Sequence, residues 1–226
     1  MDIRFLGHAC FELSDGDARV LVDPFLTGNP KAAASADEVE PTHILLTHGH
    51  ADHYGDIEAI AKRTGAPVVA IVEIANELTE AGVENVFDPN LGGTVKFDWG
   101  WVKLVPAWHT STTPKGAVNT PAGLLIGIGG KTVYHLGDTA LFSDLRLVAH
   151  RGNPIDVALM CIGGHYTMDR LDAVVAAEFV EAGTVIPCHY DTFPPIETDV
   201  QAFKSEVESK TSSKVEVLEP GETFGA

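Results

Sequence analysis

The feature that most constrains this chain is a cluster of histidines at the end of an apolar segment. Residues 43–47 read His-Ile-Leu-Leu-Thr, and His48, His50, Asp52 and His53 follow directly. Successive side chains of a strand point to opposite faces, whereas a tight turn at the end of a strand can direct several side chains towards one point. A glycine and an alanine between the polar residues leave such a turn uncrowded. The pattern therefore predicts a metal site at the end of a buried strand.

The donor types in this cluster limit which metal it can hold. Imidazole nitrogen and carboxylate oxygen suit Zn²⁺, Mn²⁺, Ni²⁺ or iron. Cys10, Cys161 and Cys188 lie far apart in the chain and form no CxxC pair, and none is near the cluster. A structural zinc site of the cysteine type is therefore excluded. Each cysteine stands in or beside an apolar run, which predicts buried thiols in a reducing compartment.

Three further polar residues stand where a site could use them. Each comes directly after a predicted apolar strand: His109 after residues 102–107, Asp138 after residues 132–136 and His189 after residues 185–187. Side chains just beyond the carboxyl ends of strands build the ligand sites of open α/β sheets. Any one of them alone would be interpreted as a hydrogen-bonded loop residue. Together with the cluster they supply the six or seven ligands that two divalent cations need.

Strands and helices are predicted along the whole chain. The strands arrive in runs, with helices between some of them in both halves, which predicts a four-layer αβ/βα sandwich of two mixed β-sheets flanked by helices. No linker or low-complexity run divides the chain, so residues 1–226 are predicted to form a single domain. The helices are predicted at residues 56–63, 72–81, 143–150, 171–181 and 200–208, and the strands at 3–6, 10–13, 19–23, 43–47, 68–70, 86–87, 94–97, 102–107, 123–127, 132–136, 157–161, 185–187 and 214–218.

Longer motifs resemble the metallo-β-lactamase superfamily. Thr-His-x-His-x-Asp-His at residues 47–53, then a lone His, a Gly-Asp and a late His, is similar to the pattern of that superfamily. Longer motifs of the chain resemble one branch of this superfamily, the metal-dependent hydrolases related to the ascorbate-6-phosphate lactonases. The motifs that carry this likeness are Gly-His-Ala at 7–9, Asp-Pro-Phe-Leu-Thr-Gly-Asn at 23–29, Gly-Asp-Thr-Ala-Leu-Phe-Ser-Asp at 137–144 and His-Tyr-x-Thr-Phe-Pro at 189–194. The resemblance covers nearly the whole chain.

The resemblance implies a metallo-β-lactamase fold and a dinuclear metal centre. Its ligands would be His48, His50 and His109 for the first metal, Asp52, His53 and His189 for the second, and Asp138 as the bridge. A hydroxide shared by two cations is a nucleophile at neutral pH, because binding lowers the pKa of water from about 15.7 towards ~7. Asp52 would orient this hydroxide. The chain is thus predicted to be a hydrolase that cleaves an ester, lactone, amide or phosphodiester of a small molecule.

Two further histidines are candidates for roles beside the metals. His8 ends the first predicted strand, within a motif that the branch shares, and is interpreted as a residue that supports the ligands or contacts the substrate. His165 follows two glycines, at a position where relatives tend to carry an asparagine. It is either a proton donor to the leaving group or a loop residue without a role. The other polar and aromatic residues predicted to be structural are His43, His135, His150, Trp99, Trp101 and Trp108.

Net charge bears on the alternatives. The chain has 32 acidic and 15 basic residues and a net charge of −17, which repels a phosphate backbone. This disfavours the first alternative, a nuclease or phosphodiesterase acting on nucleic acid. A second alternative is a flavodiiron-like redox protein, but such proteins typically carry Glu at the position of His50 and need a flavin domain. A third, a non-catalytic metal-binding protein, is disfavoured by the complete ligand set.

The remaining expectations concern substrate and location. The loops at residues 24–41, 110–121 and 163–170 would set specificity, and their few basic residues disfavour a highly phosphorylated substrate. No stretch approaches the roughly 18 apolar residues of a membrane span, and the N-terminus is typical of a first strand rather than a signal peptide. We therefore expect a cytoplasmic protein with a small-molecule substrate and neither a membrane nor a nucleic-acid partner. Homo-oligomer formation is left open.

Overall fold

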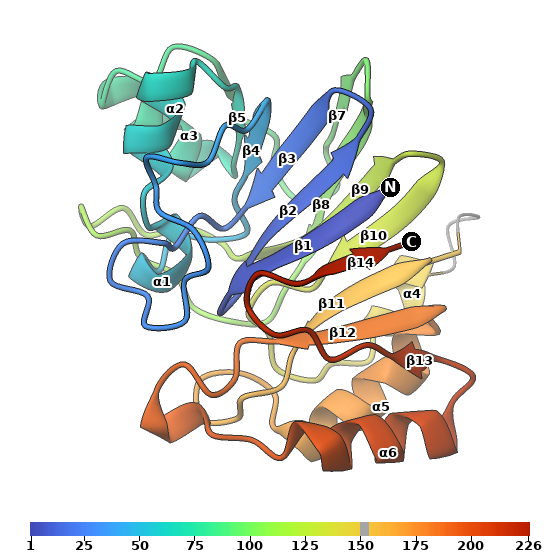
Figure 1. The fold of residues 1–226 in the computed structure, drawn as a ribbon. Coiled ribbons are helices and arrows are strands. Elements are labelled where there is room, and N and C mark those ends of the chain that lie inside the picture. The colour runs from blue at the N-terminus through green and yellow to red at the C-terminus, as the bar shows by residue number, and fades with distance from the viewer. Residues whose placement is uncertain (150–153) are drawn as a thin grey trace.

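A computed structural model describes residues 1–149 and 154–226 of the chain. Two seven-stranded sheets pack against each other, with α2 (Ile57–Thr64) and α3 (Val72–Glu80) outside the first and α5 (Arg170–Val180) and α6 (Val200–Lys210) outside the second (Figure 1). The predicted four-layer sandwich is confirmed. Among the described residues, no helix has the length and apolar character to cross a bilayer.

The two sheets share one plan. In the first, β1 to β3 are antiparallel and β3 to β6 are parallel; in the second, β7 to β10 are antiparallel and β10 to β13 are parallel. The first sheet has the order β14 (Thr223–Gly225), β1 (Asp2–Gly7), β2 (Cys10–Asp15), β3 (Ala18–Val22), β4 (His43–Leu45), β5 (Val68–Val69) and β6 (Val86–Phe87). The second has the order β13 (Lys214–Val215), β12 (Thr184–Cys188), β11 (Val157–Cys161), β10 (Lys131–His135), β9 (Ala122–Ile128), β8 (Gly100–Pro106) and β7 (Thr94–Phe97).

The main core lies between the sheets. It joins Val20 and Ile44 of the first sheet to Ile126, Val133 and Leu159 of the second, all fully buried. Every residue of β9 and of β11 is buried, because helices or the other sheet cover both faces. Strands buried on both faces are continuous apolar runs, which is why β11 was predicted with its correct bounds. All three cysteines are free and buried, as predicted.

Some elements differ from the predictions. The histidine cluster contains a one-turn helix, α1 (Ala51–Tyr54), where a turn was expected, and β14 and the short 3-10 helix η1 (Pro194–Ile196) were not predicted. The helix predicted at residues 143–150 is α4 (Leu145–Ala149), and His150 lies outside the described residues. The prediction that Trp108 packs in the core is wrong: it is 68% exposed, because it lies beyond the end of β8, past the edge of the sandwich.

Candidate dinuclear metal site

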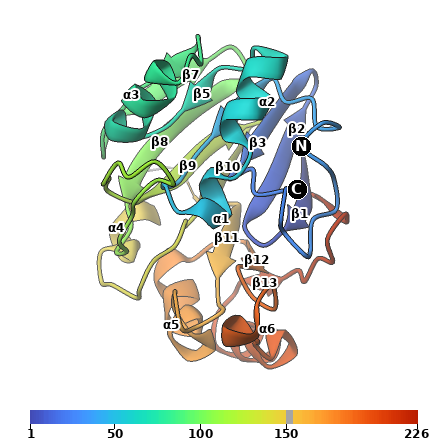
Figure 2. The same ribbon diagram turned by 90° about the vertical axis from the view of Figure 1, so that its left-hand side faces the viewer.

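Four imidazole rings surround one buried carboxylate at an end of the sandwich. Oxygens of Asp138, three residues past β10, lie 3.3 Å from Nε2 of His53 and 3.2 Å from Nε2 of His189. The corresponding distances are 3.6 Å to His109 and 3.9 Å to His48. Figure 2 looks onto this end of the molecule, where α1 lies between the α2–α3 side and the α5–α6 side. The strand-end positions thus converge on Asp138.

The predicted ligands form two groups. One consists of His48, His50, His109 and Asp138, and the other of His8, Asp52, His53 and His189. Within each group, one ligand atom from every residue lies within 4.8 Å of the others. The first group matches the predicted ligands of one metal together with the predicted bridge. The second contains the ligands predicted for the other metal and adds His8. The structure brings all seven predicted ligands together, and their binding of metal stays a prediction.

Helix α1 and the turn before it set the spacing of the cluster. The carbonyl of His50 accepts hydrogen bonds from the backbone N–H groups of His53 (3.0 Å) and Tyr54 (2.8 Å), so one helical turn holds this part of the cluster. A Cβ at Gly49 would lie 2.7 Å from the side-chain nitrogen of Asn119 and 3.1 Å from the backbone nitrogen of Thr113, so these neighbours would have to shift. The loop that carries Thr113 and Asn119 therefore packs directly on the turn, and glycine fits there without displacing it.

Asp23 is a residue of this site to which sequence reasoning assigned no role. Its side chain is fully buried and accepts hydrogen bonds from the backbone N–H of Thr47 (2.8 Å), the Thr47 hydroxyl (2.6 Å) and Nδ1 of His53 (2.7 Å). Because Nδ1 of His53 donates to Asp23, Nε2 of that ring is directed at Asp138 and is free to bind a cation. The signal was available: Asp23 follows β3 directly, as the other candidates follow their strands.

His8 lies behind Asp52. Its Nε2 donates to Oδ2 of Asp52 (3.1 Å), and its Nδ1 accepts from the hydroxyl of Thr192 (2.8 Å). Burial lowers the pKa of His8 to about 4, although Asp52 opposes the shift, so the ring is neutral at pH 7 and can both donate and accept. Thr192 lies 184 residues away in sequence, and nothing in the local pattern indicates this contact.

Three residues of the site adopt a backbone conformation that side chains other than glycine rarely take. The φ angles of His8, Asp23 and His189 are 60°, 48° and 55°. Each such residue costs on the order of 1–3 kcal/mol and persists only where its surroundings fix it. Here the surroundings include the hydrogen bond from the backbone N–H of His189 to the carbonyl of His8 (2.7 Å). Strain gathers at this site because these side chains must point inward just as their strands end.

The charges at the centre shift one another's pKa. Burial lowers the pKa of His53, but Asp138 and Asp23 outweigh it and raise this pKa well above its usual value. Burial also lowers the pKa of His189, but the nearby Asp138 outweighs burial and raises this pKa to about 9. Burial raises the pKa of Asp138, but His189 and His53 hold it well below its usual range. The carboxylate is therefore an anion, and the two imidazoles carry protons that a bound cation would replace.

The buried polar atoms fit a metal. Among the described residues, Nε2 of His53, Oδ1 of Asp138 and both ring nitrogens of His189 have no hydrogen-bond partner. Nε2 of His53 and Oδ1 of Asp138 lie 3.3 Å apart but are not aligned as a hydrogen bond. Leaving such groups unsatisfied costs free energy, and a divalent cation between them would satisfy several at once. The donor set, imidazole and carboxylate without thiolate, is that of a catalytic rather than a structural zinc site.

A cavity of about 500 Å³ opens beside the two groups. Its lining contains His50, Asp52 and Asp138 together with Phe25, Ala51, Tyr166 and Phe193. His165 is not part of this lining: it is exposed, with a φ of 40°, and its ring packs edge-on against Tyr166 at 4.5 Å. The loop predicted to contribute His165 therefore contributes Tyr166 instead, and a catalytic role for His165 stays a prediction.

Sequence comparisons identify the family. The family model described as "Beta-lactamase superfamily domain" matches residues 2–189. A UPF0173 metal-dependent hydrolase of Thermus thermophilus is 46% identical over 225 residues, which is 99% of this chain and 98% of that protein. Another, of Methanopyrus kandleri, is 47% identical over 229 residues and covers 99% of both. The chain belongs to the UPF0173 metal-dependent hydrolases, within the metallo-β-lactamase superfamily.

A solved structure agrees with this UPF0173 assignment. Igni18, described as a novel metallo hydrolase from the hyperthermophilic archaeon Ignicoccus hospitalis, superposes with a TM-score of 0.90 at 36% identity, over 100% of this chain and 98% of that one. The superfamily and the metal-dependent hydrolase activity predicted from the sequence are confirmed at this level.

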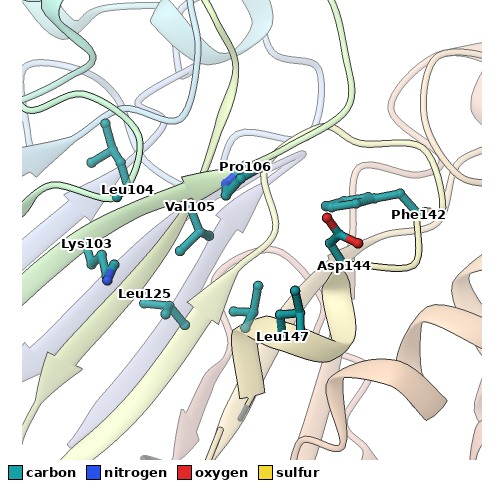
Figure 3. A pocket seen from close by; sticks show the side chains of 10 residues that line it. Lys103, Leu104, Val105, Pro106, Leu125, Phe142, Asp144 and Leu147 are labelled. Atoms are coloured by element: carbon teal, nitrogen blue, oxygen red, sulfur yellow. The ribbon is translucent and has the colours of Figure 1, made fainter. Parts of the chain in front are cut away.

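The UPF0173 chain has a second cavity, of about 330 Å³, that shares no lining residue with the candidate metal site. Figure 3 shows it against β8 and β9 and beside α4, with Val105, Leu125 and Leu147 as apolar walls. Among its described lining residues, Lys103 and Asp144 are charged and none is a histidine. This described lining therefore lacks the cluster of donors that the candidate metal site has.

For this UPF0173 hydrolase we expect Asp23→Asn to weaken metal binding by about 10- to 100-fold, the range typical of residues that orient a ligand. The amide nitrogen would face the N–H of His53 and force the ring out of its present tautomer. Dissociation constants from competition with a chelator measure the effect. Asp17→Asn, in an exposed turn, is the matched control. Wild-type affinity in Asp23→Asn would contradict the role given to Asp23.

Proposed function

We propose that this protein cleaves an ester, lactone, amide or phosphodiester bond of a small molecule with the help of two divalent cations. The observation that carries the proposal is the pair of four-residue ligand groups that lie beside Asp138 and open onto a cavity. A cavity of about 500 Å³ has the size of known small-molecule sites. Zn²⁺ is the first candidate, with Mn²⁺, Ni²⁺ and iron as alternatives that the same donors accept.

Asp138 would hold both cations. Its Oδ1 lies near His53 of one group, and its Oδ2 lies 3.2 Å from His189 of that group and 3.6 Å from His109 of the other, so the carboxylate reaches both groups. Two bound cations would lower the pKa of the attacking water and polarise the bond to be cleaved. The backbone strain and the hydrogen bonds of Asp23 would keep the ligands in place before the substrate arrives.

Asp52 would orient the attacking water. It belongs to the second group, lines the cavity and keeps 32% of its side chain exposed. Burial would raise the pKa of Asp52, but the nearby imidazoles of His189, at 3.6 Å, and His8, at 3.1 Å, hold it well below its usual range. An anion that binds protons so weakly serves better to orient a water molecule than to store its proton. His8, fixed by Thr192, would be the positioning residue for Asp52.

We also propose descent shared with the ascorbate-6-phosphate lactonases. The support is the set of motifs at residues 7–9, 23–29, 137–144 and 189–194. Each of these motifs contributes a residue to the site: His8, Asp23, Asp138 and His189. The proposal concerns ancestry and does not extend to the substrate.

The proposed function is tested on protein reconstituted separately with Zn²⁺, Mn²⁺ and Ni²⁺. Each form is assayed against lactones, 4-nitrophenyl esters, amides, thioesters, phosphodiesters and β-lactams. We expect turnover of at least one class that depends on the added metal and is lost on chelation. Absence of turnover across the panel in every form, with metal content verified by elemental analysis, would contradict the proposal.

We expect the His165→Ala variant to retain both metals. Its rate of hydrolysis should fall more for an unactivated ester than for an activated one. A 4-nitrophenolate leaving group hardly needs a proton, whereas an alkoxide does. If His165 donates that proton, the unactivated ester should slow by about 10²-fold or more. Rates on the two esters, measured with metal content, provide the readout. If His165→Ala hydrolyses both esters at the wild-type rates, His165 is a loop residue without a role. If the variant loses metal, His165 is a ligand.

A further inference from the structure

The cavity beside the candidate ligands has an aromatic wall. Apart from His50, Asp52 and Asp138, its lining consists of Ala51 and three aromatic residues. The three rings come from separate parts of the chain: Phe25 follows β3, Tyr166 lies between β11 and α5, and Phe193 precedes η1. Tertiary structure alone brings these three rings to one wall.

Two of the rings are held by the site itself. Phe25 and Phe193 both pack edge-on against His8, with ring centroids 5.7 Å and 5.6 Å away. His8 in turn donates to Asp52, so the aromatic wall and the reactive carboxylate share one support. Asp56 also holds the loop after Phe25, because its carboxylate accepts from the backbone N–H groups of residues 26 and 27 at 3.0 and 2.8 Å. Two rings of the wall are therefore built into the site.

The third ring is exposed. Tyr166 is 53% exposed although it lines the cavity, so it stands at the boundary with solvent. The exposed apolar surface of this ring is in contact with water, and covering it would be favourable. A substrate in the cavity would provide that cover.

No cationic side chain lies in the described lining of this cavity. Of the basic residues in the surrounding loops, Lys115 forms an ion pair with Glu58 and Arg170 forms one with Glu206, while Lys31 is exposed and outside the described lining. Phosphate and carboxylate groups on ligands are commonly bound by arginine or lysine. Apart from the predicted metals, the described lining therefore offers no cationic side chain to an anionic group, and it offers aromatic surface to an apolar one.

We infer that the substrate is a carboxylic ester or lactone whose uncharged aromatic or aliphatic group rests against Phe25, Tyr166 and Phe193. This inference rests on the proposed hydrolase function. In the reaction, the oxygen of water forms a bond to the acyl carbon, and the bond from that carbon to the leaving oxygen breaks. One proton of the water passes to the leaving oxygen, which gives an alcohol and a carboxylic acid.

The inference is tested with matched 4-nitrophenyl esters of increasing length: acetate, butyrate and hexanoate. Each CH₂ placed against the wall should raise kcat/KM by up to about fourfold. We therefore expect hexanoate to exceed acetate by at least about tenfold. The 4-nitrophenyl monoester of adipic acid has the same chain length but ends in a carboxylate. It should fall at least about tenfold below the hexanoate.

Variants assign the effect to the wall. Tyr166→Ala and Phe193→Ala should flatten the dependence on chain length, whereas Tyr166→Phe, which keeps the ring, should preserve it. Leu171→Ala is the matched control, because Leu171 is an apolar residue 57% exposed near Tyr166 and outside the lining. As a readout without turnover, calorimetry should show binding of 4-phenylbutan-1-ol to the purified protein, weakened severalfold in Tyr166→Ala and unchanged in Leu171→Ala.

Three results would overturn the inference, and they differ in what they leave standing. Equal rates across the chain lengths, or an adipate ester as good as the hexanoate, would remove the apolar substrate and leave the hydrolase. Cleavage of bis(4-nitrophenyl) phosphate without cleavage of any carboxylic ester would replace the substrate class and also leave the hydrolase. If the protein hydrolyses no compound in any metal form, both the proposed function and the inference are wrong.

Discussion

Asp138→Ala is expected to lose one metal equivalent per chain and nearly all hydrolytic activity. Asp138 is the residue approached by four imidazoles, at 3.2 to 3.9 Å, two of them from each ligand group. Removing it takes a ligand from both predicted metals and removes the carboxylate that these four imidazoles share. Elemental analysis of the purified variant and its rate on the best substrate of the panel measure the two effects.

Asp144→Ala is the matched control for this variant. Asp144 lies in the same motif, six residues further on, but it is exposed, and among the described residues its side chain accepts a hydrogen bond only from the hydroxyl of the adjacent Ser143. It should keep both metals and its activity. Asp138→Asn adds a second comparison, because it keeps the shape of the side chain and removes its charge. An Asp138→Ala protein with two metals and wild-type turnover would show that this carboxylate is not the bridge.

Chelation is expected to abolish turnover and to lower the melting temperature. Without metal, the site would bury Oδ1 of Asp138, Nε2 of His53 and both ring nitrogens of His189 without hydrogen-bond partners, and such groups are costly to bury unless a cation satisfies them. A ligand present at 100 times its dissociation constant stabilises the folded state by about 2.7 kcal/mol. In a chain of this size, that corresponds to a shift of roughly 5–10 °C.

Differential scanning calorimetry before and after verified metal removal measures this shift, and re-addition of Zn²⁺ should restore both temperature and turnover. The Asp138→Ala variant should show a smaller change on chelation, because it has less metal to lose. An unchanged melting temperature in wild-type protein stripped of metal would show that the candidate ligands do not contribute a bound cation to stability.

Local patterns predicted three short strands with the bounds that the structure gives them, and of these only β11 is a buried apolar run. Residues 86–87, 94–97 and 157–161 were predicted with the bounds that β6, β7 and β11 have. An edge strand that is stabilised only by a partner distant in sequence was not predicted from local patterns. β14 pairs only with β1, at the opposite end of the chain, and its three residues have no periodicity of their own. Helix α1 was missed because the metal-ligand spacing of its residues resembles a turn.

The sequence by itself determined the fold class and the set of ligand candidates. Both follow from short-range rules: apolar runs form strands, and polar residues directly after them gather at one edge of a sheet. The same rule also marked Asp23, which sequence reasoning passed over. Tertiary structure alone decided the tautomer of His53, the contact of His8 with Asp52 and the aromatic wall. These depend on hydrogen bonds and packing between residues up to 184 positions apart, which no local pattern encodes.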